Sequence, residues 1–428
     1  MQNFLSSLSA VVWGAPMLLF FIFTASRFTL KSRFFQIRGV GTIAKNTFGK
    51  MFSRRSEGGI SQFSAFCSVL GACIGTGNIV GVATAIYSGG AGSVFWMWIS
   101  AMLSTMTAYS ENYLGVTIRA DSKGSPLRGA YAYIKKASSS EAVTFSYAVF
   151  AFMSALGMGN LTQSNSLSDS LKNSFGISPY VTGAICALLC GVVIMGGVKR
   201  IAKMQTVLVP AMTVFYLVLS LWVLLKFKEN ILPCLTLILK DAFSLKALNG
   251  YGMYKAVRYG VSRGVFSNEA GLGSSTIIHA ETESNNGEVQ GMWAMTEVFV
   301  DTIFMCTLTA LVILVSTNYP QNNLFGSALS IEAYGTIGEI GKKGVGILTA
   351  VFAFTSLTSC SLYGEKSFRF IFGDNRVTLY RLCYILLVFL GCTSAPTTIW
   401  TIADICNGLM ALPNLFAVNC LHREVTYP

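Results

Sequence analysis

An apolar run from residue 63 to residue 86 is interrupted at its centre by glycines and two polar side chains. The run is long enough to cross a bilayer, because about 20 apolar residues suffice. Between Gly71 and Gly81 the chain reads Gly-Ala-Cys-Ile-Gly-Thr-Gly-Asn-Ile-Val-Gly, a poor sequence for a continuous helix. Irregular backbone within a membrane is tolerated where it is buried in protein or lines a wet cavity. The segment therefore predicts either a broken helix beside a binding site or, more simply, close packing of helices through small residues.

A second run of membrane length, residues 257–280, is interrupted in the same manner. From Arg263 to Ser275 it reads Arg-Gly-Val-Phe-Ser-Asn-Glu-Ala-Gly-Leu-Gly-Ser-Ser, so polar residues and glycines occupy its middle. Two glycine-interrupted segments in corresponding places of two halves are typical of the binding site of a secondary transporter. Close packing through small residues would have to explain both interruptions independently. The two interrupted runs together therefore favour a transporter binding site.

Composition places the chain in the membrane. Hydrophobic residues make up 53% of it and charged residues 12%, with a mean hydropathy of +0.57, whereas soluble proteins carry about 25% charged residues. We expect a single transmembrane domain over residues 1–428. The 31 basic and 19 acidic residues include no basic segment interleaved with aromatics, which argues against a nucleic-acid partner. The cysteines lie mostly in apolar runs and the two histidines, His279 and His422, are isolated, so we expect no disulfide, metal cluster or cofactor beyond a coupling ion.

The first apolar run, residues 8–26, has no basic residue before it and is followed by a basic cluster that begins at Arg27. It is expected to be a retained, extra N-terminal helix with its N-terminus outside, because positive charge flanks the cytoplasmic end of a span. Residues 27–60 hold eight basic residues and apolar residues at helical spacing. This pattern indicates an interfacial helix on an anionic lipid surface.

Apolar runs of membrane length number about eleven. Those not yet named lie near residues 93–118, 142–167, 180–198, 205–225, 290–316, 345–371, 377–393 and 396–420. Apart from the first helix, five runs over residues 63–225 open with the first break and five over residues 257–420 open with the second, the pattern of an inverted repeat. Under alternate threading, the loops expected to be cytoplasmic carry twenty-one basic residues and the outer loops nine, which supports an outside N-terminus and a cytoplasmic C-terminus. The outer loop 226–256 has the apolar spacing of an amphipathic helix.

The two breaks together suit a small zwitterion. The N-terminus of a half-helix presents free amide groups and the positive end of its dipole, which favours a carboxylate. The unwound carbonyls of the other break can hold an ammonium group, and an aromatic ring can close over it. The substrate-binding residues expected on these grounds are Gly75, Thr76, Gly77 and Asn78 in the first break and Phe266, Ser267 and Asn268 in the second.

Three further groups of polar residues lie at membrane depth. Gln163 is expected to contact substrate, with Asn165 nearby, although either amide could simply join neighbouring helices by hydrogen bonds. The hydroxyls of Thr355 and Ser356, with the loosened carbonyls of Gly71 and Ile74, would give Na⁺ a set of hard oxygen ligands without a carboxylate. Those hydroxyls could instead bond carbonyls of their own helix.

The expected intramembrane charges are functional candidates by default, and they are Glu111, Arg263, Glu269, Asp301 and Asp404. Arg263 and Glu269 flank the second break, and a gating or pairing role is favoured over a substrate role. The sequence leaves open which of these charges pair with one another. Proton coupling through Glu111, Glu269 or Asp301 remains an alternative to Na⁺ coupling.

At this point the residues resemble a known family over nearly the whole chain, the alanine or glycine:cation symporters, which are sodium-coupled amino-acid carriers with a leucine-transporter-type fold. The matching stretches begin at Gly58, Gly75, Gly159, Gly196, Arg263, Tyr363 and Ala403. The string Phe-Ser-Asn-Glu-Ala-Gly after Arg-Gly is the most specific of them. The resemblance implies an all-α membrane protein with a five-plus-five inverted repeat and one extra N-terminal helix. It also places Gln163 toward the core and gives Thr355 and Ser356 the positions of Na⁺ ligands.

Two departures from the family pattern bear on these expectations. The segment from Arg128 to Tyr133 differs where the family usually reads Gly-Gly-Pro-Met-Tyr-Tyr, which concerns the cytoplasmic surface. Cys360 stands where the family usually has tryptophan. If that side chain borders the site, the pocket is larger, and substrates larger than alanine are expected to compete well.

The favoured function is therefore a sodium-coupled symporter that imports a small neutral amino acid, such as alanine or glycine, by alternating access in the cell inner membrane. The expected partners are that amino acid, Na⁺ and membrane lipid, and a monomer is compatible with the sequence. A channel would need rings of charge or carbonyl filters in repeated subunits, and an enzyme would need a nucleophile with a base in reach. The sequence offers neither pattern.

Overall fold

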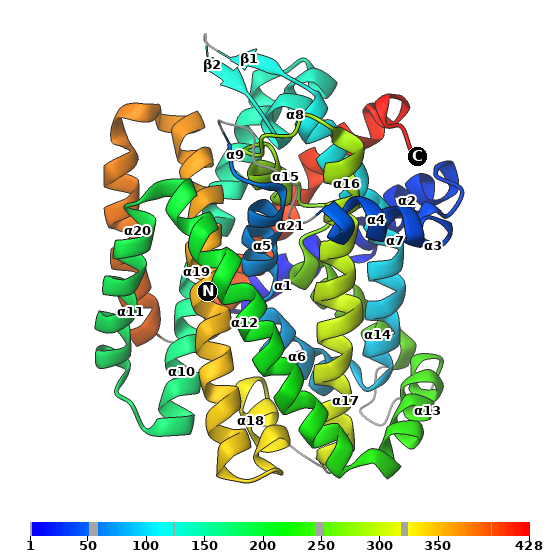
Figure 1. The fold of residues 1–428 in the computed structure, drawn as a ribbon, viewed down its shortest axis with the longest axis vertical. Helices are drawn as coiled ribbons and strands as arrows, with labels where there is room; N and C mark the ends of the chain where they lie inside the picture. Colours follow the sequence, from blue (N-terminus) through cyan, green and yellow to red (C-terminus); the bar gives the residue numbers. More distant parts are fainter. Residues whose placement is uncertain (1, 51–58, 123–124, 245–251, 318–323, 395) are drawn as a thin grey trace.

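The computed structural model describes residues 2–50, 59–122, 125–244, 252–317, 324–394 and 396–428. Within these residues the fold is almost entirely helical, and helices run along the long axis of the molecule (Figure 1). Two short antiparallel strands, β1 (Ala120–Ser122) and β2 (Ser125–Leu127), pair with Ala120 opposite Leu127. The described part of the chain is therefore a helical bundle with one small hairpin at its end.

Seven helical segments in the described residues are long and apolar enough to cross a membrane, and a bent pair makes an eighth. The seven are Ser7–Lys31, Glu141–Phe175, Gly197–Lys226, Gly287–Ser316, Glu339–Phe372, Asp374–Thr393 and Thr401–Cys420. The remaining members of the predicted set of about eleven are α7 (Gly92–Thr117), α11 (Pro179–Ile194) and the second interrupted run. The boundaries of the two repeats, residues 63–225 and 257–420, stay a prediction.

The first break is a bend of 56° between α5 (Gln62–Cys73) and the helical segment Thr76–Gly89, which includes α6 (Val80–Gly89). The backbone amide of Gly75 donates to Asn78 Oδ1 at 3.2 Å within the turn. Every residue from 71 to 83 is buried. The predicted interruption of this run is thus confirmed, and it lies inside the protein rather than against lipid.

The second break separates α14 (Gly252–Asn268) from α15 (Ser275–His279). Its backbone enters the left-handed region at Glu269, Gly271 and Gly273, with φ of 55°, 93° and 73°. A Cβ atom at Gly271 would lie 2.3 Å from the ring of Phe21, and one at Gly273 would lie 2.6 Å from Asn414 Oδ1. Both glycines are therefore needed for the backbone conformation and for the close approach of neighbouring side chains.

Two membrane helices contain π-helical segments, which occur frequently at functional sites. One segment, Gly157–Thr162, joins α9 (Glu141–Leu156) to α10 (Gln163–Phe175). The other, Phe299–Cys306, joins α16 (Gly287–Val298) to α17 (Thr307–Ser316). Gln163 directly follows the first π segment and Asp301 lies within the second, and both side chains reach the first break.

The N-terminal region consists of α1 (Gln2–Val12) and α2 (Ala15–Lys31), which pack against α21 (Pro396–Cys420) and α7. The predicted single interfacial helix in residues 27–60 is wrong in one respect, because two short helices are present, α3 (Phe35–Arg38) and α4 (Val40–Asn46). Gly39 lies between them, and the ring of Phe35 packs so closely against it that a Cβ atom there would collide with the ring.

Several short elements lie at the two ends of the bundle (Figure 1). The hairpin and α8 (Ala130–Ser138) lie at the upper end with the C-terminus, and α13 (Ile231–Ala242) and α18 (Ser327–Gly335) lie at the lower end. The predicted amphipathic helix in loop 226–256 is confirmed as α13, where Ala242 O accepts from Trp96 Nε1 at 3.0 Å. Helices α8 and α18 were not predicted, because they are too short to show a clear period.

Three long helices complete the frame around the breaks. They are α12 (Gly197–Lys226), α19 (Glu339–Phe372) and α20 (Val377–Thr393). Helix α19 packs against α5, α9, α10 and α12, so it lies between the first break and the surrounding helices. Most of its central residues, from Thr355 to Glu365, are buried.

Candidate functional site

The first break carries a polar cap supplied by the protein itself. Gln163, the first residue of α10, accepts hydrogen bonds through Oε1 from the backbone amide of Thr76 at 3.1 Å and from its hydroxyl at 3.0 Å. Both residues are buried. Gly75 is placed so that a Cβ atom would lie 2.4 Å from Ser356 Oγ, and it leaves room for this cluster. The oxygen of Gln163 thus lies where the sequence analysis places a substrate carboxylate.

The two breaks meet at Gly77. A Cβ atom added there would lie 3.7 Å from both Phe266 Cδ1 and Ser267 Cα. Phe266 packs in a buried cluster with Met158 and Ala403. The predicted substrate residues of both breaks therefore lie together, with the aromatic ring of Phe266 between them.

Asn78 and Asp301 connect the first break to α16 and α17. Asn78 Nδ2 donates to Asp301 Oδ1 at 2.8 Å and to the backbone oxygen of Asp301 at 3.0 Å. Asp301 also accepts from the hydroxyl of Thr302 at 2.8 Å, and that hydroxyl accepts from Asn268 Nδ2 at 3.0 Å. Because their amides are held in this chain of hydrogen bonds, Asn78 and Asn268 position the breaks, and neither amide nitrogen points to an open space.

Ser356 contacts the carbonyls at the end of α5. Its hydroxyl lies 3.0 Å from Gly71 O and 3.1 Å from Ala72 O, as donor to either. The hydroxyl of Thr355 instead donates to Phe352 O in its own helix at 2.8 Å, beside Met212 of α12. The structure therefore brings Ser356 to one of the two predicted Na⁺-binding carbonyls, that of Gly71, and to the carbonyl of Ala72, which was not predicted. It places the Thr355 hydroxyl against its own helix, the alternative that the sequence left open.

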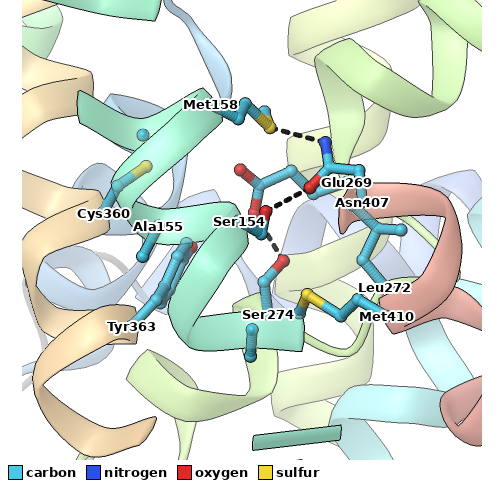
Figure 2. A pocket seen from close by; sticks show the side chains of 12 residues that line it. Ser154, Ala155, Met158, Glu269, Leu272, Ser274, Cys360, Tyr363, Asn407 and Met410 are labelled. Atoms are coloured by element: carbon cyan, nitrogen blue, oxygen red, sulfur yellow. Dashed lines mark hydrogen bonds between the residues drawn. The ribbon is translucent and has the colours of Figure 1, made fainter. Parts of the chain in front are cut away.

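A small cavity lies beside the second break, between α9, α19 and α21 (Figure 2). Its volume of about 20 Å³ is enough for one water molecule. Glu269 and Ser274, which are hydrogen-bonded to each other, line it opposite Cys360 and Tyr363. Gly159 and Cys360 are in contact, since a Cβ atom at Gly159 would lie 2.4 Å from Cys360 Cβ. Cys360 thus borders a cavity, but the space beside it holds a water-sized group rather than the several carbon atoms of the larger pocket considered from the sequence.

The structure shows which of the intramembrane charges pair, a point that the sequence left open. Arg263 forms a two-pronged ion pair with Asp404 of α21, with N···O distances of 3.3 and 3.2 Å. The indole of Trp13 donates to the backbone oxygen of Asp404 at 2.8 Å. Arg263 thus has a pairing role, with Asp404 as its partner rather than Glu269. Glu269 follows the end of α14 in a left-handed conformation, and its carboxylate turns to Ser274 instead.

A larger, polar cavity of about 190 Å³ adjoins this ion pair. It lies between the N-terminal region, α14 and α21, and its lining residues are Ser9, Trp13, Arg258, Tyr259, Ser262, Arg263, Thr401 and Asp404. The guanidinium of Arg263 also lies 5.4 Å from the centre of the Phe266 ring. Arg263 and Phe266 therefore separate this cavity from the meeting point of the two breaks.

Glu111 supports the loop of the second break rather than an open site. Its carboxylate accepts from the backbone amide of Gly271 at 3.2 Å and from Asn414 Nδ2. Asn414 Nδ2 also donates to Gly271 O at 2.8 Å. Both side chains are buried, so the loop conformation depends on this contact.

Sequence reasoning missed two buried polar groups. His279, described above as isolated, lies with Nε2 2.9 Å from Glu297 Oε1 and Nδ1 2.6 Å from Gln290 Oε1. Gln205 of α12 is fully buried against α19 and α5. The available signal was a single polar side chain in an apolar run, which does not reveal a partner distant in the sequence.

Comparison with known proteins agrees with this architecture. The model of the sodium:alanine symporter family matches residues 1–427. The chain is 38% identical to an uncharacterised transporter of Haemophilus influenzae, over 99% of this chain and 94% of that protein. It is 36% identical to the sodium/alanine symporter AgcS of Methanococcus maripaludis, over 99% and 95% of the two chains.

A solved structure gives the fold. MhsT in complex with L-phenylalanine matches with a TM-score of 0.63 at 13% identity, over 86% of this chain and 90% of that one. The likeness confirms the leucine-transporter-type fold expected from the sequence. With its apolar helices, two facing breaks and match to the family model, the chain belongs to the sodium:alanine symporter family, a family of multi-pass membrane symporters rather than enzymes.

Proposed function

We propose that the protein is a Na⁺-coupled symporter that imports a small neutral amino acid, alanine, glycine or a similar molecule, by alternating access. The observation that carries this proposal is the meeting of the two breaks at Gly77 and Phe266, with a protein oxygen at the amide end of the first. A helix terminus that accepts the oxygen of Gln163 can accept a carboxylate oxygen in its place.

The substrate carboxylate would replace Gln163 Oε1 at the amide and hydroxyl of Thr76. The freed amide of Gln163 can then donate through Nε2 to that carboxylate. The ammonium group would bind carbonyl oxygens at the end of α14, near Ser267, beneath the ring of Phe266. The side chain would point toward Gly159 and Cys360, where the narrow space favours small substituents.

Na⁺ would bind between α5 and α19. Ser356 and the carbonyl of Gly71 are already within 3.0 Å of each other, and rotation of the Ser356 hydroxyl would turn its lone pairs to the ion. Ile74 O and Thr355 Oγ1 complete the expected ligand set, Thr355 after its hydroxyl leaves Phe352 O. Since α5 leads directly into the first break, cation binding there would favour the backbone conformation that receives the substrate.

We further propose that the N-terminus faces the outside, the C-terminus the cytoplasm, and that the cell inner membrane is the location. The segments with most basic residues support this orientation. They include the α8 region, and the C-terminal tail with Arg423 lies at the same end of the molecule (Figure 1). The cavity beside Arg263 and Asp404 would then open toward the outside.

Uptake of radiolabelled alanine into proteoliposomes tests the proposal. We expect uptake driven by an inward Na⁺ gradient, saturation with alanine, and competition by glycine. A pH gradient alone, with choline replacing Na⁺, tests the proton-coupled alternative through Glu111, Glu269 or Asp301. Alanine uptake driven by that gradient without Na⁺ would overturn the assignment of the ion, and currents that do not saturate would indicate a channel.

A further inference from the structure

Gln205, near the beginning of α12, joins α19 through its amide nitrogen. Nε2 lies 2.9 Å from Thr355 O, 3.0 Å from Thr358 Oγ1 and 2.8 Å from Ser359 Oγ. The side chain is fully buried. The amide nitrogen is thus surrounded by three oxygen atoms of one helix.

Chemistry fixes which end of this amide faces α19. The backbone oxygen of Thr355 can only accept, so the group opposite it must be the nitrogen. The hydroxyl of Thr358 is within donor distance of Phe354 O and Thr355 O, at 2.9 and 3.0 Å, which leaves its lone pairs for Gln205. A flipped amide would place two oxygen atoms against each other. Gln205 Oε1 must therefore point away from α19.

Oε1 points toward the end of α5 and has no hydrogen-bond partner among the described residues. A Cβ atom at Gly71 would lie 2.6 Å from it, so only glycine at this position allows the approach. A buried amide oxygen without a partner is unfavourable, because desolvation is not offset by any interaction. The same Gly71 carries the carbonyl that contacts Ser356.

We infer that Gln205 Oε1 is an additional ligand of the coupling cation, which joins α12 to the site between α5 and α19. The inference rests on the proposed Na⁺ coupling and extends its ligand set beyond Gly71, Ile74, Thr355 and Ser356. An amide oxygen is a hard, neutral ligand of the kind that alkali and alkaline-earth cations accept. It adds no negative charge, which suits a monovalent ion in a site without a carboxylate.

A ligand on α12 would have a mechanical consequence. With the cation bound, ligands from α5, α12 and α19 would share one ion. Gln205 is at the same time hydrogen-bonded to Thr355, Thr358 and Ser359 of α19. When the cation leaves, Gln205 remains on α19 and only the contact with α5 is released. Cation release would then break the link between α12 and α5, while the Ser356 hydroxyl can still join α19 to α5.

The test measures the Na⁺ concentration for half-maximal alanine uptake in proteoliposomes for wild type, Gln205→Leu and Gln205→Met. We expect both variants to raise that concentration about tenfold, the effect of one lost ligand, while uptake at saturating Na⁺ persists. Thr213→Val is the matched control, because its hydroxyl bonds only Val209 O in the same helix, and it should behave as wild type. Na⁺-dependent thermal stabilisation of the purified variants without substrate gives a second readout that does not need transport.

The outcomes separate the possibilities. Wild-type Na⁺ dependence in either variant, with wild-type stabilisation by NaCl relative to choline chloride, would overturn the inference and show that a buried water satisfies Oε1. Wild-type uptake that needs no Na⁺ would overturn the proposed coupling itself. If Gln205→Leu fails to fold, Gln205→Met, which keeps the length of the side chain without its amide, decides the question.

Discussion

Gln163 Oε1 accepts hydrogen bonds from both the backbone amide and the hydroxyl of Thr76 across the first helix break. A single side-chain oxygen thus satisfies the donors that a bound carboxylate would use. The substrate must displace this oxygen to reach them, so the affinity for substrate depends on the difference between two similar interactions.

Replacement of Gln163 tests this relationship. Gln163→Glu should still accept from Thr76 but brings a negative charge to the carboxylate position, so we expect loss of most alanine uptake. Gln163→Leu should raise the half-saturating alanine concentration roughly tenfold, because leucine cannot donate to the carboxylate. Asn165→Leu is the control, since Asn165 bonds Ser394 O away from the break. Wild-type affinity in well-expressed Gln163→Leu would return this residue to a packing role.

The two hydroxyls of the proposed Na⁺ site should differ in importance. Ser356→Ala removes the hydroxyl that contacts Gly71 O and should raise the Na⁺ concentration for half-maximal uptake about tenfold. Thr355→Val should have a smaller effect, because its hydroxyl bonds Phe352 O. Uptake measured over a series of Na⁺ concentrations checks both. A larger effect for Thr355→Val would show that its hydroxyl turns to the ion during transport.

The contributions of Arg263 and Asp404 to stability should depend on each other, because the two side chains form an ion pair. Both side chains are mostly buried, with 14% and 17% exposed, so Asp404→Asn or Arg263→Met alone should destabilise the fold by about 3 kcal/mol. The double variant should recover part of that loss, because no unpaired charge remains. Thermal unfolding in detergent for the four proteins gives the coupling energy. Additive losses would mean that the two charges act independently.

Enlargement of Cys360 should narrow the range of substrates. The side chain in Cys360→Trp is much larger than the water-sized cavity near Glu269 and would press on Gly159. We therefore expect serine and 2-aminobutyrate to compete less well with labelled alanine, while glycine still competes. Cys360→Ala is the control and should leave the competition profile nearly unchanged. Identical profiles for Cys360→Trp and wild type would show that this position does not border the substrate.

Local patterns in the sequence were sufficient for the fold and for the elements of the site. The glycines of the two breaks and the apolar runs around them act within a few residues, so composition and spacing reveal them. The pairing of charged side chains could not be predicted in this way. Arg263 with Asp404, and His279 with Glu297, are paired by the packing of separate helices, and no local period records which helices meet.

The orientation of a side chain on its helix was equally hidden. Thr355 and Ser356 are adjacent and chemically similar, yet one faces α12 and the other the end of α5. Adjacent residues differ by about 100° around a helix, and the direction of each depends on the neighbouring helices. The position of Gln205 was hidden for the same reason, because its side chain approaches Gly71 of a different helix.

The contact between α2 and the C-terminal region bears on how the chain is made. Arg27 donates to both oxygens of Asn419, Thr24 accepts from its amide at 2.6 Å, and Lys31 donates to Val425 O at 3.0 Å. These partners emerge from the ribosome only after nearly all other spans. The first span is therefore made before Asn419 and Val425 are available to it, and a chain truncated ahead of α21 would lack these contacts.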